Sequence, residues 1–261
     1  MNAPANMNGR FKGHVLFVRM AYDPKTKDEV TEAAEAACFE LSAAGYLVTP
    51  TRKKGTADIG DNRNVVASQF YVRTEYTHLV MYDQDVSWEP GAILRLVVHP
   101  VDLVLGVYKK RIEPEGWPIR TLPGPVECVN PQTGKYHPDG IIKIAGGPGG
   151  LMRLSRSCIE KMVSAHADEW YASKLVPGGK VWDLFRFERL DHERISEDMN
   201  FCRLWRALGG DVWADPHLRL HHWGDKAFSG CLAAHLREIG RMIEPEKIAK
   251  IALDAEPGLN H

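Results

Sequence analysis

The sequence predicts an α/β protein whose largely parallel sheet is covered by helices on both faces. Short apolar runs typical of buried strands alternate with helix-like segments four times in the first 110 residues. Strands joined through helices make right-handed crossovers, which set neighbouring strands parallel. The 261 residues are 44% hydrophobic and 26% charged, values typical of a globular chain with a large core.

The first half of the chain supplies this alternation. An apolar run at 14–19, with the sequence HVLFVR, predicts a buried strand. Residues 28–44 carry apolar side chains at helical spacing and stop before Gly45, a natural helix end. Similar signals predict a strand at 46–49, a helix at 63–74 capped by Asp61 or Asn62, a strand at 77–82, a helix at 91–98 with Pro90 in its first turn, and a strand at 102–108.

The alternation stops after residue 108. Residues 109–139 contain six prolines and no clear periodicity, and a loop of this length is usually functional or mobile. The remaining pattern predicts a strand at 141–144, a glycine-rich segment at 146–150, a helix at 155–164, a strand at 182–187, a helix at 196–208, strands at 211–214 and 218–221, and mostly helix after 227.

Charge and cysteine content argue against several classes of protein. The net charge is near −1, so the whole chain gives no support for nucleic-acid binding, although a local basic patch stays open. Five scattered cysteines without a CxxC argue against a zinc ribbon, an iron–sulfur site or a disulfide framework. With no signal-peptide pattern and no bilayer-length apolar run, we expect a soluble cytoplasmic protein without stable membrane insertion.

The acidic triplet Asp83-Gln84-Asp85 directly follows a predicted buried strand, at the end where α/β sheets bind ligands. Mg²⁺ and Mn²⁺ usually take one or two carboxylates together with substrate phosphates. A solvated acidic loop is the alternative. The strand before the triplet and the proline-initiated helix after it favour a cation site.

Two adjacent histidines, His221 and His222, lie at the end of the predicted strand at 218–221. Histidine is the commonest nitrogen ligand for transition metals. Neighbouring residues of a strand point to opposite faces, so the two rings cannot both face one site while the strand continues. From the residues alone, a pair of edge histidines without a catalytic role is favoured.

Ser196-Glu197-Asp198 opens a predicted helix. Acidic residues in a first turn interact favourably with the helix dipole, which is a sufficient structural reason for them. The functional alternative is a general base beside a reacting hydroxyl group. The residues alone favour the structural reason.

Two further features have structural and functional explanations. The glycines at 146–150 lack the spacing of GxGxxG or GxxxxGK[ST], so they form either a plain loop or a place where the backbone comes close to a sugar or an acceptor. Arg63 stands beside Asp61 and Asn64 at a helix start. Its guanidinium could pair with a diphosphate, or it could be a surface arginine beside a cap.

Taken in order, these segments resemble the GT-A glycosyltransferases, and more closely the small, stand-alone, family 2-like members of bacteriophages and some bacteria. The matching stretches are THLVMYDQDVSWEPGAILRL, DLVLGVYKKR, AGGPGGLMRLSR, SEDMNFCRLWRALGGDVWADP and LRLHHWG. The resemblance implies one catalytic domain over 1–261, with a nucleotide-sugar-binding half at 14–110, an acceptor half at 111–230 and a helical tail at 231–261.

The resemblance also implies residue roles. Asp85 would bind a Mn²⁺ or Mg²⁺ ion directly, Asp83 would contact the ion or the donor ribose, and His222 would complete the metal shell. Asp198 would be the base of an inverting reaction, with Glu197 as the second candidate. The residues implied in binding the nucleotide are Met20, Ala21, Tyr22, Arg63, Asp83, Gln84 and Lys109.

The function implied is metal-dependent, inverting transfer of a sugar from a UDP-sugar to an acceptor hydroxyl. The acceptor could be a hydroxymethylated pyrimidine in double-stranded DNA, contacted from the long loop by Trp117, Lys109, Lys110, Arg111 and Arg120. These side chains could instead merely solvate the loop. A surface polysaccharide or lipid-linked acceptor is the alternative. The loop is no general family feature, so the resemblance leaves the acceptor open.

Two other classes stay open. Nucleotidyltransferases also use paired carboxylates and Mg²⁺, but they usually carry an early glycine-rich signature where this chain has RMAYDPKTKD. A non-catalytic sugar-binding relative is disfavoured by the intact acidic and histidine motifs. The sugar, the preferred metal and the oligomeric state do not follow from the sequence.

Overall fold

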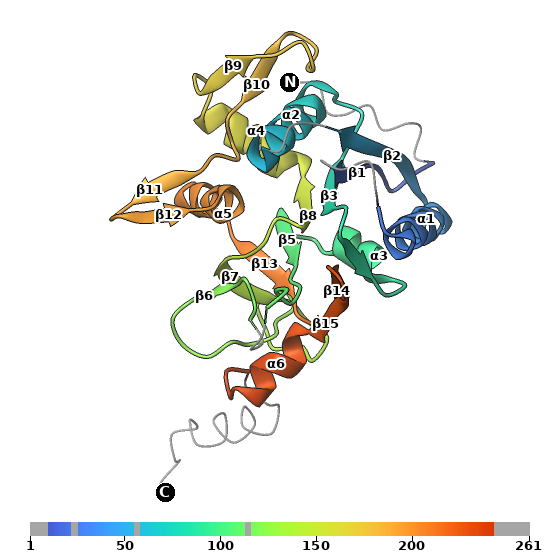
Figure 1. The fold of residues 1–261 in the computed structure, drawn as a ribbon, viewed down its shortest axis with the longest axis vertical. Coiled ribbons are helices and arrows are strands. Elements are labelled where there is room, and N and C mark those ends of the chain that lie inside the picture. The colour runs from blue at the N-terminus through green and yellow to red at the C-terminus, as the bar shows by residue number, and fades with distance from the viewer. Residues whose placement is uncertain (1–9, 22–25, 55–57, 113–115, 243–261) are drawn as a thin grey trace, which may run out of the picture.

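The computed structural model describes residues 10–21, 26–54, 58–112 and 116–242, which form an α/β fold around an eight-stranded sheet (Figure 1). The strand order is β2-β1-β3-β8-β5-β13-β7-β6. The bounds are β1 (Gly13–Ala21), β2 (Tyr46–Lys54), β3 (His78–Asp83), β5 (Leu103–Gly106), β6 (Arg120–Thr121), β7 (Ile142–Gly146), β8 (Leu151–Ser155) and β13 (Val212–Asp215).

The predicted α/β class with a mostly parallel sheet is confirmed. Among the described strands of this sheet, six run in one direction, whereas β7 and β8 run in the other. β8 lies between β3 and β5 and separates the two groups of parallel strands. Strands from both predicted halves of the chain therefore join one sheet.

Helices cover both faces of the sheet, as the alternation predicts. The helices are α1 (Asp28–Ala43), α2 (Ile59–Val72), α3 (Ala92–Val98), α4 (Arg156–Ala165), α5 (Glu197–Ala207) and α6 (Leu232–Glu238). Leu16 and Val18 of β1 pack in the core that contains α2, α4 and α5. Val15 and Phe17 pack in the core that contains α1 and α3. Because the middle of β1 is buried on both faces, its residues 15–18 are continuously apolar rather than alternating.

Three smaller sheets complete the described fold. One has the order β15-β14-β4, and two are hairpins, β9–β10 and β11–β12. The bounds are β4 (Val86–Trp88), β9 (Trp170–Ala172), β10 (Lys180–Trp182), β11 (Glu188–Leu190), β12 (Glu193–Ile195), β14 (Arg219–Trp223) and β15 (Ala227–Cys231). The β11–β12 turn places Asp191 and His192 at φ angles of 48° and 68°.

Three local predictions are wrong. Helix α2 is capped by Asp58, whose side chain accepts from the Asp61 backbone N–H, so the helix starts before the predicted caps. The predicted strand at 182–187 ends at Trp182. The segment at 227–231, predicted helical, is strand β15, because it pairs with β14. Of the predicted tail, residues 243–261 lie outside the described part of the chain.

No helix in the described part of the chain combines the length and apolar character that crossing a bilayer requires.

Candidate active site

The carboxyl ends of β1 and β3 lie side by side. Met20 and Asp83 are in register, and the Gln84 backbone N–H donates to the Met20 carbonyl over 3.0 Å. Ala21, the last residue of β1, is buried. Gln84 is buried too, and its side-chain oxygen Oε1 has no hydrogen-bond donor among the described residues. Tyr22, also predicted to bind the nucleotide, lies outside the described residues.

Arg63 connects two of the predicted catalytic segments. Its side chain is 3% exposed and forms ion pairs with Asp83, at 3.1 Å, and with Glu197. Asp83 ends β3, and Glu197 is the first residue of α5. The guanidinium therefore ties the sheet edge to the start of α5. The alternative of a surface arginine beside a helix cap is wrong, because the side chain points into the protein.

Three carboxylates surround this one guanidinium. Burial alone would lower the pKa of Arg63, but Asp83, Glu197 and Asp198 outweigh burial and raise the pKa above its ordinary value. Burial also raises the pKa of Asp83 and of Glu197, with Arg63 opposing the rise and neighbouring carboxylates adding to it. Since acidic groups outnumber the arginine, the electrostatics of this cluster favour a further cation.

Asp85 and His222 meet beside this cluster. Strand β14 pairs with β4, and the Trp223 backbone N–H donates to the Asp85 carbonyl over 2.8 Å. The His222 Nε2 atom lies 3.6 Å from Oδ2 of Asp85, and Nη1 of Arg111 lies 3.1 Å from the same oxygen. Arg111 also donates to the Trp223 carbonyl over 2.7 Å. One carboxylate oxygen thus faces both a histidine nitrogen and an arginine.

The backbone fixes the orientation of the His222 ring. Its Nδ1 atom lies 3.0 Å from the Lys109 carbonyl oxygen, which can only accept a hydrogen bond. The neutral ring therefore carries its proton on Nδ1 and presents the Nε2 lone pair toward Asp85, the arrangement typical of metal-binding histidines. His221 points the other way and contacts Ser229 at 2.7 Å, so the predicted opposite orientation of the two rings is confirmed.

The carboxylates and histidines do not form a ready-made metal cage. Among the described residues, no group of three or more His, Cys, Asp or Glu side chains is arranged to hold a metal ion. Asp85 and His222 form a pair, whereas Asp83 faces Arg63. Such a pair fits a divalent cation that completes its shell with phosphate oxygens and water. The metal shell of Asp83, Asp85 and His222 stays a prediction.

Asp198 is held by three donors. Its Oδ1 accepts from the Met199 backbone N–H over 2.7 Å and from the Ser196 hydroxyl. Its Oδ2 accepts from the Gly149 backbone N–H over 2.9 Å. A carboxylate offers about four acceptor positions, so one remains available. Because Asp198 is partly exposed and Glu197 is buried against Arg63, Asp198 is the better placed of the two to take a proton.

The glycine-rich segment brings the backbone close to two buried side chains. A Cβ on Gly149 would lie 2.7 Å from the guanidinium carbon of Arg63, and one on Gly150 would lie 2.3 Å from the Tyr108 hydroxyl. The Tyr108 ring in turn contacts the His222 ring, with centroids 4.6 Å apart. These glycines let the backbone pack closely against protein side chains, and the predicted approach to a sugar or an acceptor stays a prediction. Sequence reasoning missed Tyr108, whose place under Gly150 depends on a contact between distant segments.

The predicted acceptor-contacting residues of the long loop separate in space. Arg111 reaches Asp85, whereas Trp117 is partly buried and stacks on His235 with ring centroids 5.5 Å apart. Trp117 is therefore not an exposed platform for a base. Arg120 lies in β6 and lines a groove of about 390 Å³ together with Met199 and Arg206 of α5.

No protein-family model matches the sequence, and no curated protein matches it. Among solved structures, the chain is similar to a protein from STIV, with 14% identity and a TM-score of 0.47 over 84% of this chain and 91% of the other. It is similar to a glycosyltransferase involved in glycosylation of the major capsid of PBCV-1 (12% identity, TM-score 0.32, 59% and 66% of the two chains). A third similarity is to GalNAc-T7 with UDP, GalNAc and Mn²⁺ (10% identity, TM-score 0.41, 80% and 43%). At these identities and TM-scores, the similarities assign no residue role to this chain.

Proposed function

We propose that this protein transfers a sugar from a UDP-sugar to an acceptor hydroxyl, with inversion and with a divalent cation. The observation that carries the proposal is the meeting of two acidic segments, the end of β3 and the start of α5, on the buried guanidinium of Arg63. This arrangement supports the proposal because an acidic edge of the sheet, which would attract a cation, lies beside the partly exposed carboxylate of Asp198.

On the donor side, Asp85 and His222 are the residues that would hold the cation. The ion supplies Lewis-acid stabilisation of the negative charge that develops on the nucleoside diphosphate. Arg63 holds Asp83 at the end of β3, next to Gln84, whose side-chain oxygen has no donor among the described residues. If the Gln84 side chain turns outward, this oxygen can accept a hydrogen bond from the nucleoside. Met20, Ala21, Tyr22 and Lys109 remain predicted nucleotide contacts.

On the acceptor side, Asp198 is the base. Hydrogen bonds from Ser196, Met199 and Gly149 fix its carboxylate and leave one acceptor position for the incoming hydroxyl. The hydroxyl oxygen forms the bond to the anomeric carbon while the bond to the diphosphate oxygen breaks, and Asp198 takes the proton. Glu197 positions Arg63 rather than reacting.

The acceptor enters by the groove that Arg120 and Arg206 line, next to Met199 on α5. The groove is lined by three arginines, Arg120, Arg203 and Arg206, and by two carboxylates, Asp191 and Glu193. This excess of positive charge favours an acceptor that carries phosphate or carboxylate. Hydroxymethylated pyrimidine in DNA meets this requirement and offers a primary alcohol, so it is the acceptor we propose. The alternative is a negatively charged polysaccharide or lipid-linked acceptor.

Calorimetry with UDP tests the donor side. We expect UDP to bind the full chain in Mn²⁺ and to lose most of that affinity when EDTA is added. Asp85→Asn should abolish the cation-linked part of binding. Asp211→Asn is the matched control, because Asp211 pairs with Lys143 at 2.8 Å on the surface and faces no proposed ligand. UDP binding that is the same with and without Mn²⁺ would contradict the cation assignment.

A transfer assay tests the reaction. UDP release from UDP-glucose, UDP-galactose and UDP-N-acetylglucosamine is compared with hydroxymethylcytosine DNA and with unmodified DNA. Release that depends on the hydroxymethyl group supports the DNA acceptor, and release with an anionic polysaccharide instead supports the other acceptor. Conversion of UTP and a sugar 1-phosphate into a UDP-sugar would replace the proposal with a nucleotidyltransferase.

A further inference from the structure

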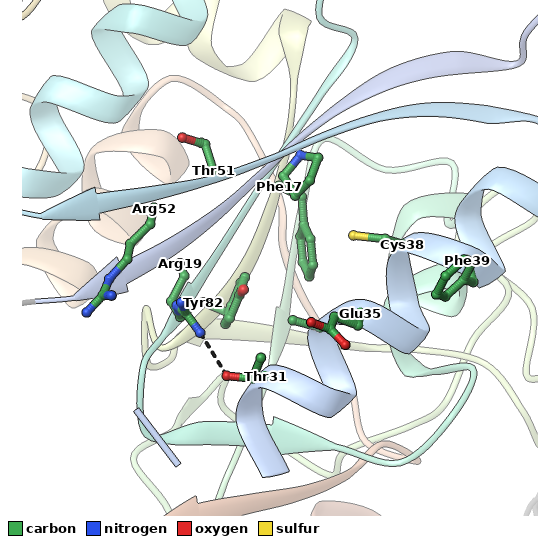
Figure 2. Close-up of a pocket in the computed structure, with 11 residues that line it drawn as sticks. Phe17, Arg19, Thr31, Glu35, Cys38, Phe39, Thr51, Arg52 and Tyr82 are labelled. Carbon is green, nitrogen blue, oxygen red and sulfur yellow. Dashed lines mark hydrogen bonds between the residues drawn. The ribbon is translucent and has the colours of Figure 1, made fainter. Parts of the chain in front are cut away.

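A cavity of about 550 Å³ lies between α1 and the paired strands β1 and β2 (Figure 2). We call it the α1 pocket. Its walls come from Phe17 and Arg19 of β1, from α1, from Pro50 to Arg52 of β2, and from Tyr82 of β3. It shares no side chain with the candidate active site, although Tyr82 directly precedes Asp83 in β3. Its volume falls in the range of about 300–1,000 Å³ typical of small-molecule sites.

One end of the pocket is cationic. Arg19 and Arg52 stand in register on the neighbouring strands β1 and β2, and both line the cavity. Like charges directly opposite one another on a sheet are unfavourable, so an anion between them would stabilise the pair. Among the described residues, Arg19 forms no ion pair; its Nη1 donates to the Thr31 hydroxyl over 3.1 Å, and its buried Nε has no acceptor.

The rest of the pocket is mainly apolar. The rings of Phe17 and Tyr82 stack with centroids 4.7 Å apart, and Ala34 and Cys38 of α1 are small enough to leave the space open. Phe39 also lines the cavity and is 78% exposed, so its ring is accessible to a ligand in the cavity. Aromatic side chains of this kind favour stacking or edge contacts with another ring.

The α1 wall adds one acceptor. Thr31, Glu35 and Phe39 follow each other at intervals of four residues, so they form one stripe of the helix that faces the cavity. The Glu35 carboxylate lies between the hydroxyl and the aromatic ring in this stripe. It can accept a hydrogen bond from a hydroxyl or amino group on the body of a ligand.

We propose that the α1 pocket binds a small aromatic anion, with its carboxylate or phosphate on Arg19 and Arg52 and its ring among Phe17, Phe39 and Tyr82. This site is separate from the proposed sugar transfer and does not depend on it. A ligand needs both a negative charge and an aromatic ring to bind tightly, because the cationic end and the aromatic walls belong to one cavity.

The test uses 8-anilinonaphthalene-1-sulfonate, itself an aromatic anion, as a fluorescent probe on the full chain. Phenyl phosphate and phenylacetate should displace it, whereas benzyl alcohol and inorganic phosphate should each be at least about tenfold weaker, since each lacks half of the recognised chemistry. Stronger displacement by phenyl phosphate assigns a phosphate ligand, and stronger displacement by phenylacetate assigns a carboxylate. Benzyl alcohol as effective as phenylacetate would overturn the proposal.

Matched variants locate the probe. Arg19→Gln and Phe39→Ser should each weaken displacement by phenyl phosphate about tenfold, because a charged hydrogen bond or a ring contact is lost. Arg194→Gln and Phe187→Ser are the controls: the Arg194 guanidinium lies 4.3 Å from the ring centroid of the exposed Phe187, away from the cavity. Equal affinity in all four variants would place the ligand elsewhere and refute the α1 pocket.

Discussion

Replacing Asp198 by Asn removes the proposed base, but the structure predicts a second effect. The carboxylate accepts from the Met199 and Gly149 backbone N–H groups through different oxygens. An asparagine has one carbonyl oxygen and one NH₂ group. Whichever way the amide is turned, its NH₂ faces a backbone N–H and leaves one donor without an acceptor. The variant should therefore be less stable as well as less active.

The magnitudes of the two effects can be separated. A buried donor left without a partner costs about 1–3 kcal/mol, which corresponds to a melting temperature lower by roughly 2–10 °C for a domain of this size. Loss of a general base lowers turnover by about 10²–10⁴-fold. The Ser196→Ala variant removes one hydrogen bond to Asp198 but keeps the carboxylate, so it should lose a similar or smaller amount of stability and far less turnover.

The assay measures the melting temperature, UDP affinity in Mn²⁺ and turnover for the wild type, Asp198→Asn and Ser196→Ala. We expect Asp198→Asn to keep UDP binding and lose transfer, with a lower melting temperature than the wild type. Wild-type turnover in Asp198→Asn would refute the assignment of the base. An unchanged melting temperature in Asp198→Asn would refute the hydrogen-bond reasoning, because that reasoning requires a backbone N–H left without an acceptor in the variant.

Three further outcomes are expected. Gly149→Ala should cost about 1–3 kcal/mol in denaturant unfolding and weaken UDP binding, because its Cβ would press on the Arg63 guanidinium at 2.7 Å. Burial alone would raise the pKa of Asp215, but hydrogen bonds from His99 and an arginine outweigh burial and hold this pKa below the ordinary 3.8. The ionised carboxylate therefore stabilises the fold at neutral pH, and the stability lost in Asp215→Asn should shrink as the pH falls below 4. Burial, with help from an arginine, lowers the pKa of His78 from 6.5 to about 4; wild-type stability should therefore fall by roughly 3 kcal/mol between pH 6.5 and 4, and urea titrations of His78→Gln should lack that slope.

The fold class followed from local patterns, because the central strands β1, β3 and β5 are largely buried on both faces and so contain continuous apolar runs. The directions of β7 and β8 could not follow in the same way. The five residues of each strand carry no local signal that identifies the neighbouring strands. β8 pairs with β3 and β5, which both come from the first half of the chain. The short strands β4, β11 and β12 were missed because three residues carry no measurable periodicity.

The sequence predicted those parts of the candidate site whose functional side chains are adjacent in the chain. The acidic triplet, the histidine pair and the acidic start of α5 were all visible. Arg111 and Tyr108 gained their places only through long-range contacts, one with Asp85 and the other with the backbone at Gly150. For Arg111, the sequence predicted contact with the acceptor, whereas its guanidinium faces the carboxylate that the metal prediction requires.

Glu197 and Asp198 show why adjacency in sequence is a poor guide to role. Successive helix residues are separated by about 100° around the axis, so the two side chains leave the first turn of α5 in different directions. Glu197 turns inward to Arg63 and is buried, while Asp198 turns to Gly149 and stays partly exposed. Arg63 holds Glu197 and Asp83 together, so it offsets the repulsion between the two segments. The excess negative charge that remains around it gives this edge of the sheet its attraction for a cation.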